Sequence, residues 1–222
     1  MGAISKVWMG LLLLLVSSCL AEEPEWAGLR IANGIGVGPH ALKVRINGDL
    51  WSKQGLARGQ VSSLRRLQAG RYRLSFLQDG LAGHEVRVVL EPGQQVTLVP
   101  HVQRKRGSPA WRIKVLRLNA APAGTGRVAT VVDVGLSERR VLEIKQIGKS
   151  WAPLSLRHLE LQRFKITQHR GYLPLRVGQR TLHSMPVFEE GHHVMVLFDV
   201  PGVGVSCLFF RDRIQPAPSA SG

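Results

Sequence analysis

The feature that most constrains this chain is a segment that occurs twice, about a hundred residues apart. Residues 91–99 read EPGQQVTLV and residues 189–197 read EEGHHVMVL, so glutamate and glycine precede an apolar run in both copies. Upstream of each copy, residues 71–74 (RYRL) are matched by residues 163–166 (RFKI). A period of this length indicates the duplication of a whole domain, because solenoids and propellers repeat over shorter distances. The sequence therefore predicts one β-rich unit used twice.

The composition favours strands and turns over long helices. The 222 residues are 44% hydrophobic, enough for one or two cores, and include 24 glycines and 12 prolines. Glycine and proline at this frequency are typical of a chain with many turns. We therefore expect an all-β fold of two tandem antiparallel β-sandwich domains with an immunoglobulin-like organisation.

The first 21 residues have the pattern of an export signal. Lys6 supplies the positive end, residues 11–16 the apolar centre, and small residues follow. The apolar run is too short to span a membrane as a helix. Two processing outcomes stay open: cleavage after Ala21, or lipidation of Cys19, since residues 16–19 (VSSC) resemble a bacterial lipobox. The predicted location is the periplasm, or the outer membrane as a lipoprotein if Cys19 is lipidated.

Cysteine usage gives the exported chain no intramolecular disulfide. Once the signal containing Cys19 is removed or modified, Cys207 is the remaining cysteine. It lies in an apolar, strand-like run at residues 205–210, where free cysteine is usually a small buried hydrophobe. We therefore expect the cores to hold the fold together and Cys207 to be unreactive.

Turn signals and alternating patterns divide the chain into units. Asn47 and Gly48 form a type I′ hairpin signal, because both residues tolerate positive φ. Residues 71–76 alternate polar and apolar side chains, as a half-buried strand does. The predicted order is a signal (1–21), a first β-sandwich (29–103), a basic linker (104–110), a second, diverged β-sandwich (111–212) and a disordered tail (213–222).

The sequence contains no pattern that predicts catalysis or cofactor binding. Alternating glycines at residues 33–38 resemble a phosphate loop, but a strand follows them where a phosphate loop requires a helix. The serine motif Gly-x-Ser-x-Gly is absent, and the spacings of Asp133, Asp199, Asp212 and the eight histidines do not define a triad. We predict a protein that is not an enzyme, with no catalytic residues and no cofactor.

His192 and His193 are the most tempting metal ligands. Adjacent residues on a strand point to opposite sides, so the pair cannot hold one ion without a tight bend. The first copy has Gln94 and Gln95 at these positions. This substitution favours solvated turn residues, and we predict no metal site.

A formal net charge of +15 predicts an attraction to polyanions. For an exported protein, acidic polysaccharide, envelope phosphates and anionic lipid are better partners than nucleic acid. If Tyr72 and Leu74 face the core, Arg71 and Arg73 face outward, with the same expected in the second unit. The candidate polyanion-binding residues are Arg65, Arg66, Arg71, Arg73, Arg104, Lys105, Arg106, Arg163 and Lys165. The alternative is that these are ordinary solvated charges.

The tryptophans leave two interpretations open. Trp51, Trp111 and Trp151 could stack on sugar rings or lie buried in the cores or between the domains. An arginine fork pairs well with carboxylates, so a uronate polymer or an acidic protein is a chemically sensible ligand for the basic residues.

Four short motifs carry a family resemblance. They are residues 46–48 (ING), 68–74 (QAGRYRL), 90–98 (LEPGQQVTL) and 115–122 (VLRLNAAP). With this spacing the chain resembles a short extracellular β-sandwich domain of unknown function that often occurs in tandem in bacterial exported proteins. The resemblance covers most of residues 29–103 and the two ends of residues 111–212. More distantly, the architecture is similar to the AlgF family of periplasmic accessory proteins of alginate O-acetylation, with which no catalytic motif is shared.

These observations predict a non-enzymatic exported accessory or binding protein for cell-envelope or extracellular polysaccharide modification, such as O-acetylation of an acidic polysaccharide like alginate. Its partners would be the polysaccharide or an envelope acetyltransferase complex, and a membrane only through lipidated Cys19. The alternative is a structural or adhesive cell-surface module without polysaccharide chemistry. A hydrolase or esterase is a third, separate class.

Overall fold

The computed structural model describes residues 25–38, 41–104, 110–120, 127–168, 170–187 and 190–212. Within these ranges the chain is all-β, as predicted, with strands joined by turns and no helix. The export signal, Cys19, Lys105, Arg106 and the C-terminal tail lie outside the described residues. An immunoglobulin-like topology stays a prediction.

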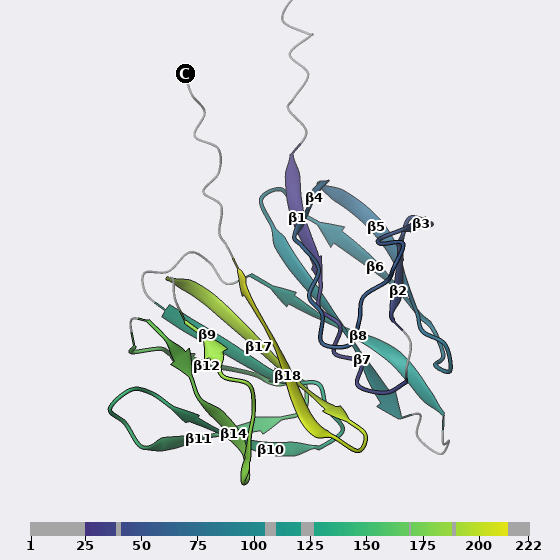
Figure 1. Cartoon of the computed structure of the whole chain (residues 1–222). Coiled ribbons are helices and arrows are strands. Elements are labelled where there is room, and N and C mark those ends of the chain that lie inside the picture. The colour runs from purple at the N-terminus through teal and green to yellow at the C-terminus, as the bar shows by residue number, and fades with distance from the viewer. Residues whose placement is uncertain are drawn as a thin grey trace, which may run out of the picture.

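The strands form four four-stranded sheets, which we name by position (Figure 1). Inner sheet 1 has the order β4 (Arg65–Gln68), β1 (Trp26–Ile31), β7 (Gln95–Arg104) and β8 (Trp111–Asn119). Outer sheet 1 has the order β3 (Asp49–Leu50), β2 (Lys43–Ile46), β5 (Gly70–Leu77) and β6 (His84–Leu90). Inner sheet 2 has the order β12 (Leu161–Lys165), β9 (Arg127–Asp133), β17 (Gly191–Val200) and β18 (Gly204–Asp212). Outer sheet 2 has the order β11 (Trp151–Arg157), β10 (Arg139–Lys145), β14 (Leu175–Val177) and β15 (Arg180–Thr181). A small fifth sheet pairs β13 (Tyr172–Leu173) with β16 (Met185–Pro186).

The same strand arrangement occurs twice along the chain. In inner sheet 1, β1 pairs parallel with β7, and in inner sheet 2, β9 pairs parallel with β17. Every other strand pair in the described residues is antiparallel. Thus β1, β4, β7 and β8 have β9, β12, β17 and β18 as counterparts, and the two outer sheets correspond in the same way.

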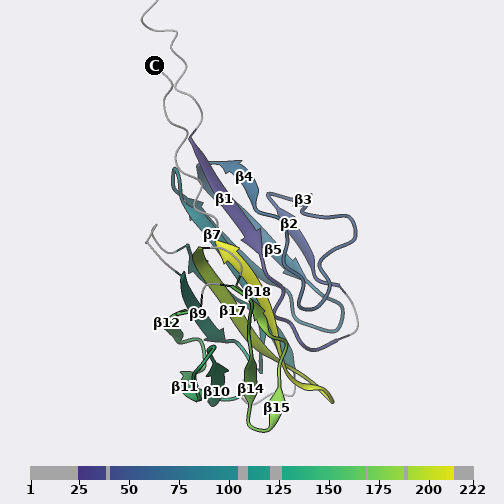
Figure 2. The same cartoon turned by 60° about the vertical axis from the view of Figure 1, so that its left-hand side comes forward.

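Three hydrophobic cores separate the four sheets. Inner sheet 1 and outer sheet 1 enclose the first, with Leu29, Leu98 and Phe76 among its members. The second core lies between inner sheet 2 and outer sheet 2. The third joins the two inner sheets, and it packs Val99 and Leu118 of the first unit with Val132, Val194, Val196 and Phe198 of the second. The layers therefore follow one another as outer 1, inner 1, inner 2 and outer 2 (Figures 1 and 2).

The sequence pattern of each strand reflects its layer. β7 and β17 lie between two cores, and most of their residues are buried on both faces, as in the run VMVLF of β17. Strands with two buried faces read as continuous apolar runs. β5 and β6 of outer sheet 1 instead alternate, because one face contacts a core and the other contacts water.

The predicted hairpin at Asn47 and Gly48 is present. It joins β2 to β3, and the two residues have φ values of 50° and 99°. Positive φ at both central residues is the type I′ requirement. The predicted burial of Tyr72 and Leu74 also agrees, with Leu74 fully buried and Tyr72 packed against the first core.

The predicted linker at residues 104–110 is wrong. Its two ends belong to neighbouring strands of one sheet, because β7 and β8 pair antiparallel from Val96 opposite Asn119 to Arg104 opposite Trp111. β7 and β8 are therefore neighbouring strands of the first unit, and residues 105–109 between them lie outside the described residues. The passage between units comes after β8, between Asn119 and Arg127. A basic, proline-containing stretch suits a hairpin connection as well as a linker, so composition alone did not separate the two.

The repeated motifs are more alike in sequence than in structural position. The two EPGQQ-like segments do lead into counterpart strands, β7 and β17, but Val96 faces the first unit's own core whereas Val194 faces the core between the inner sheets. The match of residues 71–74 with 163–166 is wrong, because the first lies on β5 and the second begins on β12, the counterpart of β4. For β7 and β17, an alignment shifted by one residue would place every side chain on the opposite face of the strand.

Candidate functional site

The structure divides the nine predicted basic residues among several places. Arg71 and Arg73 lie on β5 of outer sheet 1, Arg65 and Arg66 on the edge strand β4, Arg104 at the end of β7, Arg163 and Lys165 on the edge strand β12, and Lys105 and Arg106 outside the described residues. The two units therefore do not present one continuous basic stripe.

Arg65 and Arg66 contact tryptophans of the first unit. The guanidinium of Arg65 donates a hydrogen bond to the backbone oxygen of Trp51 and stacks on its ring, 4.2 Å from the ring centroid. Arg66 lies 4.9 Å from the ring centroid of Trp26. Trp51 is buried and Trp111 packs against the first core. These two tryptophans thus have structural positions, and Arg65 is engaged in holding Trp51.

The outward face of outer sheet 1 collects five cationic side chains. We call it basic face 1, and it consists of Lys43 and Arg45 of β2, Arg71 and Arg73 of β5, and Arg87 of β6, all exposed. Strand register brings them together: Arg73 lies directly opposite Arg87, and Arg45 lies opposite Ser75, which is the neighbour of Glu85. Sequence reasoning missed Lys43, Arg45 and Arg87. The alternation of β2 and β6 places them outward, but only the pairing order places them beside Arg71 and Arg73.

Basic face 1 carries an excess of positive charge. Among the described residues, Glu85 is the only carboxylate paired with it, at 2.7 Å from Nε of Arg73. Both side chains are well exposed, at 69% and 40%, so this pair contributes little to stability. Arg73 and Arg87 are like charges directly across a strand pair, which is unfavourable. A bound anion would relieve this repulsion.

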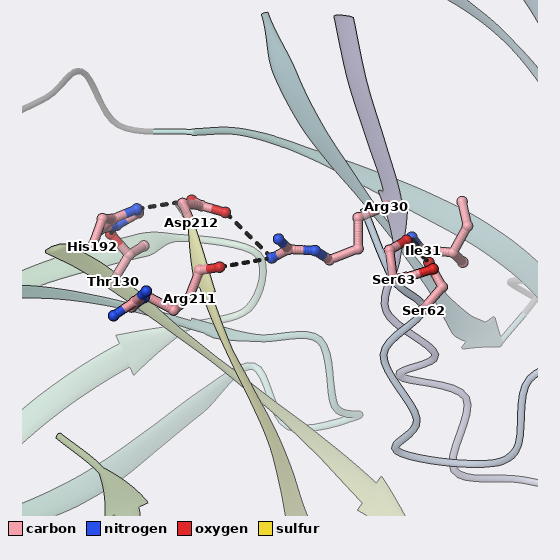
Figure 3. Close-up of polar contacts among 8 residues, drawn as sticks. All are labelled: Arg30, Ile31, Ser62, Ser63, Thr130, His192, Arg211 and Asp212. Carbon is pink, nitrogen blue, oxygen red and sulfur yellow. Dashed lines mark hydrogen bonds and ion pairs between the residues drawn. The ribbon is translucent and has the colours of Figure 1, made fainter. Parts of the chain in front are cut away.

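A buried polar network joins the two units (Figure 3). Oγ1 of Thr130 lies 2.6 Å from Nε2 of His192, and Nδ1 of that imidazole lies 2.9 Å from Oδ2 of Asp212. Arg30, from β1 of the first unit, donates to the backbone oxygen of Arg211 at 3.2 Å and lies 3.5 Å from Oδ1 of Asp212. Burial lowers the pKa of Arg30, and the charge of Asp212 opposes this effect.

Thr130, His192 and Asp212 have the order of a hydroxyl, imidazole and carboxylate triad. Their exposed fractions are only 4%, 7% and 7%, so the hydroxyl is shielded from a solvent-borne substrate. The expectation that His192 and His193 are solvated turn residues is wrong. Both are buried on β17, whereas Gln94 and Gln95 at the corresponding positions of the first unit are only partly buried. Burial, His192 and Arg127 together lower the pKa of His193.

A second buried network lies near the other end of β17. Nε of Arg140 donates to Asp133 at 2.6 Å, and its NH2 group donates to the two carboxylate oxygens of Asp199 at 2.9 and 3.0 Å. Burial lowers the pKa of Arg140, but the hydrogen bonds and charges of the two aspartates outweigh burial and raise it. The backbone N–H groups of Gly135 and Leu136 donate to the same carboxylates. Asp133 and Asp199 are therefore engaged by Arg140, which leaves neither to orient a histidine.

Close backbone packing adds to this contact between units. Gly36, in the loop after β1, lies so near β17 that any side chain there would overlap the carbonyl group of Asp199. Two of the glycines that resembled a phosphate loop, Gly34 and Gly36, thus belong to the contact between units. Glycine permits this approach because it has no Cβ.

Cys207 lies on β18 and packs against the second core. Burial raises its pKa to about 11, although a hydrogen bond to the backbone oxygen of His183 opposes the rise. The thiolate is the reactive form, so this cysteine is a poor nucleophile at neutral pH.

The described residues contain no group of three or more histidine, cysteine, aspartate or glutamate side chains placed to hold a metal ion. Nor do they contain a helix with the length and apolar character needed to cross a membrane. No known protein family matches this sequence, and no curated protein matches it either.

Proposed function

We propose that this protein is a non-enzymatic exported accessory or binding protein that holds an acidic polysaccharide, such as alginate, during its modification in the cell envelope. The observation that carries the proposal is basic face 1, where five cationic side chains from three strands lie on one exposed face. The resemblance to tandem β-sandwich domains of exported proteins, and more distantly to the AlgF family, agrees with this assignment.

The chemistry of basic face 1 suits a repeating carboxylate. Arginine forks bind carboxylates through two parallel hydrogen bonds, and four of the five cations are arginines. Adjacent strands lie roughly 4.8 Å apart, so the cations form a grid that can contact several sugar units of one polymer. Each exposed contact is weak and screened by salt, and affinity arises from their number.

O-acetylation gives this binding a purpose. A protein that holds the polymer by its carboxylates leaves the sugar hydroxyls, where acetyl groups are added, free for an envelope acetyltransferase. The described residues would act by contact, with the export signal delivering the chain to the periplasm and Cys19, if lipidated, attaching it to a membrane.

A matched pair of variants tests the proposal. Binding to immobilised alginate should fall about tenfold, the equivalent of about 1.4 kcal/mol, in Arg71→Ala with Arg73→Ala, and should also fall steeply with rising salt. The control is Arg163→Ala with Lys165→Ala, which removes the same charge from β12 of inner sheet 2 and should change binding little. Equal losses in the two double variants would show that binding follows net charge alone. Binding insensitive both to salt and to the β5 variant would overturn the mechanism, and the absence of binding would favour the structural or adhesive alternative.

One observation favours a second candidate, acyl-ester hydrolysis. It is the hydroxyl, imidazole and carboxylate geometry of Thr130, His192 and Asp212, at 2.6 and 2.9 Å. The burial of Thr130 means that a substrate would need the contact between the units to open. Hydrolysis of a small acetyl ester by the purified chain, abolished in Thr130→Val, would support this candidate.

A further inference from the structure

The outward face of outer sheet 2 also collects cations. We call it basic face 2. It consists of Lys145 of β10 and Arg176 of β14 beside Trp151, and of Arg139 of β10 and Arg157 of β11 at the other end of the same strand pair, roughly 20 Å away. Register defines the arrangement: Lys145 lies opposite Trp151, and Arg139 lies opposite Arg157. Sequence reasoning identified Trp151 alone, because the facing positions on the consecutive strands β10 and β11, and the pairing of β10 with the distant strand β14, are set by strand register.

Trp151 is the feature that distinguishes basic face 2 from a solvated sheet face. Its ring is flanked by the guanidinium of Arg176, 4.3 Å from the centroid, and by Nζ of Lys145 at 6.0 Å. Arg176 in turn is held by two hydrogen bonds to Glu143, at 2.7 and 2.9 Å, and these bonds lower the pKa of Glu143. A partly buried indole beside Arg176 and Lys145 suits a sugar ring that carries a carboxylate, since the ring stacks on the indole and Lys145 can bind the acid.

Both basic faces contain an unfavourable arginine pair. Arg139 and Arg157 lie directly opposite each other on face 2, as Arg73 and Arg87 do on face 1. Glu160 reaches Arg157 only at 4.0 Å between exposed side chains. Like charges directly across a strand pair destabilise a sheet, and an anion bound between them removes the repulsion. The same electrostatic arrangement thus occurs once on each outer sheet.

The layer order sets the two faces back to back. Outer sheets 1 and 2 are the first and last of four stacked layers, so their outward faces point away from each other (Figures 1 and 2). The core between the inner sheets and the contact of Arg30 with Asp212 join the units. A short stretch of polymer bound to one face therefore cannot reach the other.

Resting on the function proposed above, we infer that basic face 2 is a second binding site for acidic polysaccharide and that the protein bridges two chains of it. Each face contributes one contact, and the packed inner sheets hold the two contacts apart. Bridging would hold polymer strands together where they are modified. Two linked faces raise the effective concentration of one polymer chain near another, which neither face does alone.

A capture assay tests bridging separately from binding. The purified chain is loaded on beads carrying covalently attached alginate, and the retention of soluble fluorescent alginate fragments is measured. The wild-type protein should bind the beads and retain fragments. At matched loading on the beads, Arg73→Ala with Arg87→Ala, and Arg139→Ala with Arg157→Ala, should each retain about tenfold less fragment than the wild type. Trp151→Ala should reduce capture as the face 2 variant does, and Arg163→Ala with Lys165→Ala should not reduce it.

The outcomes separate the two proposals. Wild-type protein that binds the beads but captures nothing overturns bridging and leaves the proposed function standing, whereas protein that fails to bind contradicts both. Capture unchanged in the Arg139 and Arg157 variant also overturns the inference, because capture would then not depend on face 2. Capture of anionic lipid vesicles in preference to alginate would reassign the faces to a membrane surface.

Discussion

Inward-facing and outward-facing arginines have opposite surroundings. Arg30 lies on β1 of inner sheet 1 and Arg140 on β10 of outer sheet 2, and both side chains are nearly fully buried and paired with aspartates. Arg73 and Arg157 lie on the outer sheets, and their side chains are 69% and 71% exposed. A buried charge must be paired to be tolerated, whereas an exposed charge contributes little to stability and stays available to a ligand. Burial, not residue type, therefore separates the arginines that build this protein from those that can bind.

The largest effect is expected when a buried charge loses its partner. Asp133→Ala removes a fully buried carboxylate that accepts from Arg140 at 2.6 Å. We expect the free energy of unfolding to fall by about 3–5 kcal/mol, because the buried guanidinium loses a partner. Urea denaturation would measure the loss.

The matched control removes an exposed carboxylate. Glu85→Ala takes away the partner of Arg73 and should change the unfolding free energy by less than about 1 kcal/mol. Similar losses in the Asp133 and Glu85 variants would contradict the distinction between inner and outer charges.

A pH titration of unfolding tests the buried inner layers through His101, without substituting a paired charge. His101 lies buried on β7, and burial lowers its pKa to about 4, with nearby His158, Lys114 and His84 adding to the effect. A pKa lower in the folded state than in the unfolded state means that the unfolded chain binds more protons between pH 6.5 and 4. Stability from His101 is therefore present above pH 6.5 and is lost as pH falls toward 4, by about 3 kcal/mol.

His101→Gln separates this contribution from that of other groups. The variant should show a flatter loss of unfolding free energy between pH 6.5 and 4, whatever its stability at pH 7. A pH dependence identical to that of the wild type would mean that His101 is not the group that titrates.

A smaller effect is expected where the two units meet. Arg30→Ala removes the hydrogen bond to the backbone of Arg211 and the 3.5 Å contact with Asp212. Since Asp212 keeps its hydrogen bond with His192, we expect a loss of about 2 kcal/mol. Thermal unfolding would measure it, beside Arg66→Ala as a control on the tryptophan-stacked surface. No difference between the two variants would mean that Arg30 does not stabilise the contact between units.

Much of the fold could be predicted from local pattern. Alternation in β5 and the Asn47 and Gly48 turn identify strands, because side-chain period and positive φ are properties of a few adjacent residues. The recurrence of an apolar run after a glycine also led to two strands that are counterparts, β7 and β17. Local pattern predicted a linker at residues 104–110 and did not reveal that β7 and β8 pair, because a basic stretch rich in turn residues suits either arrangement.

The candidate sites depend on pairing between distant strands. Arg73 was predicted to face outward, but its position opposite Arg87 depends on the pairing of β5 with β6. The burial of His192 depends on a core shared by two units, and Arg30 lies 182 residues from Asp212. Such contacts leave no trace in the residues next to them.

By itself the sequence determined the all-β class, the duplicated strand segments and the excess of positive charge, because these follow from composition and from short-range patterns. Tertiary structure alone decided which arginines are buried and paired, which gather on the two outer faces, and that those faces point away from each other. The physical reason is that a strand's alternation specifies its two faces, whereas the burial of either face depends on which sheet packs against it.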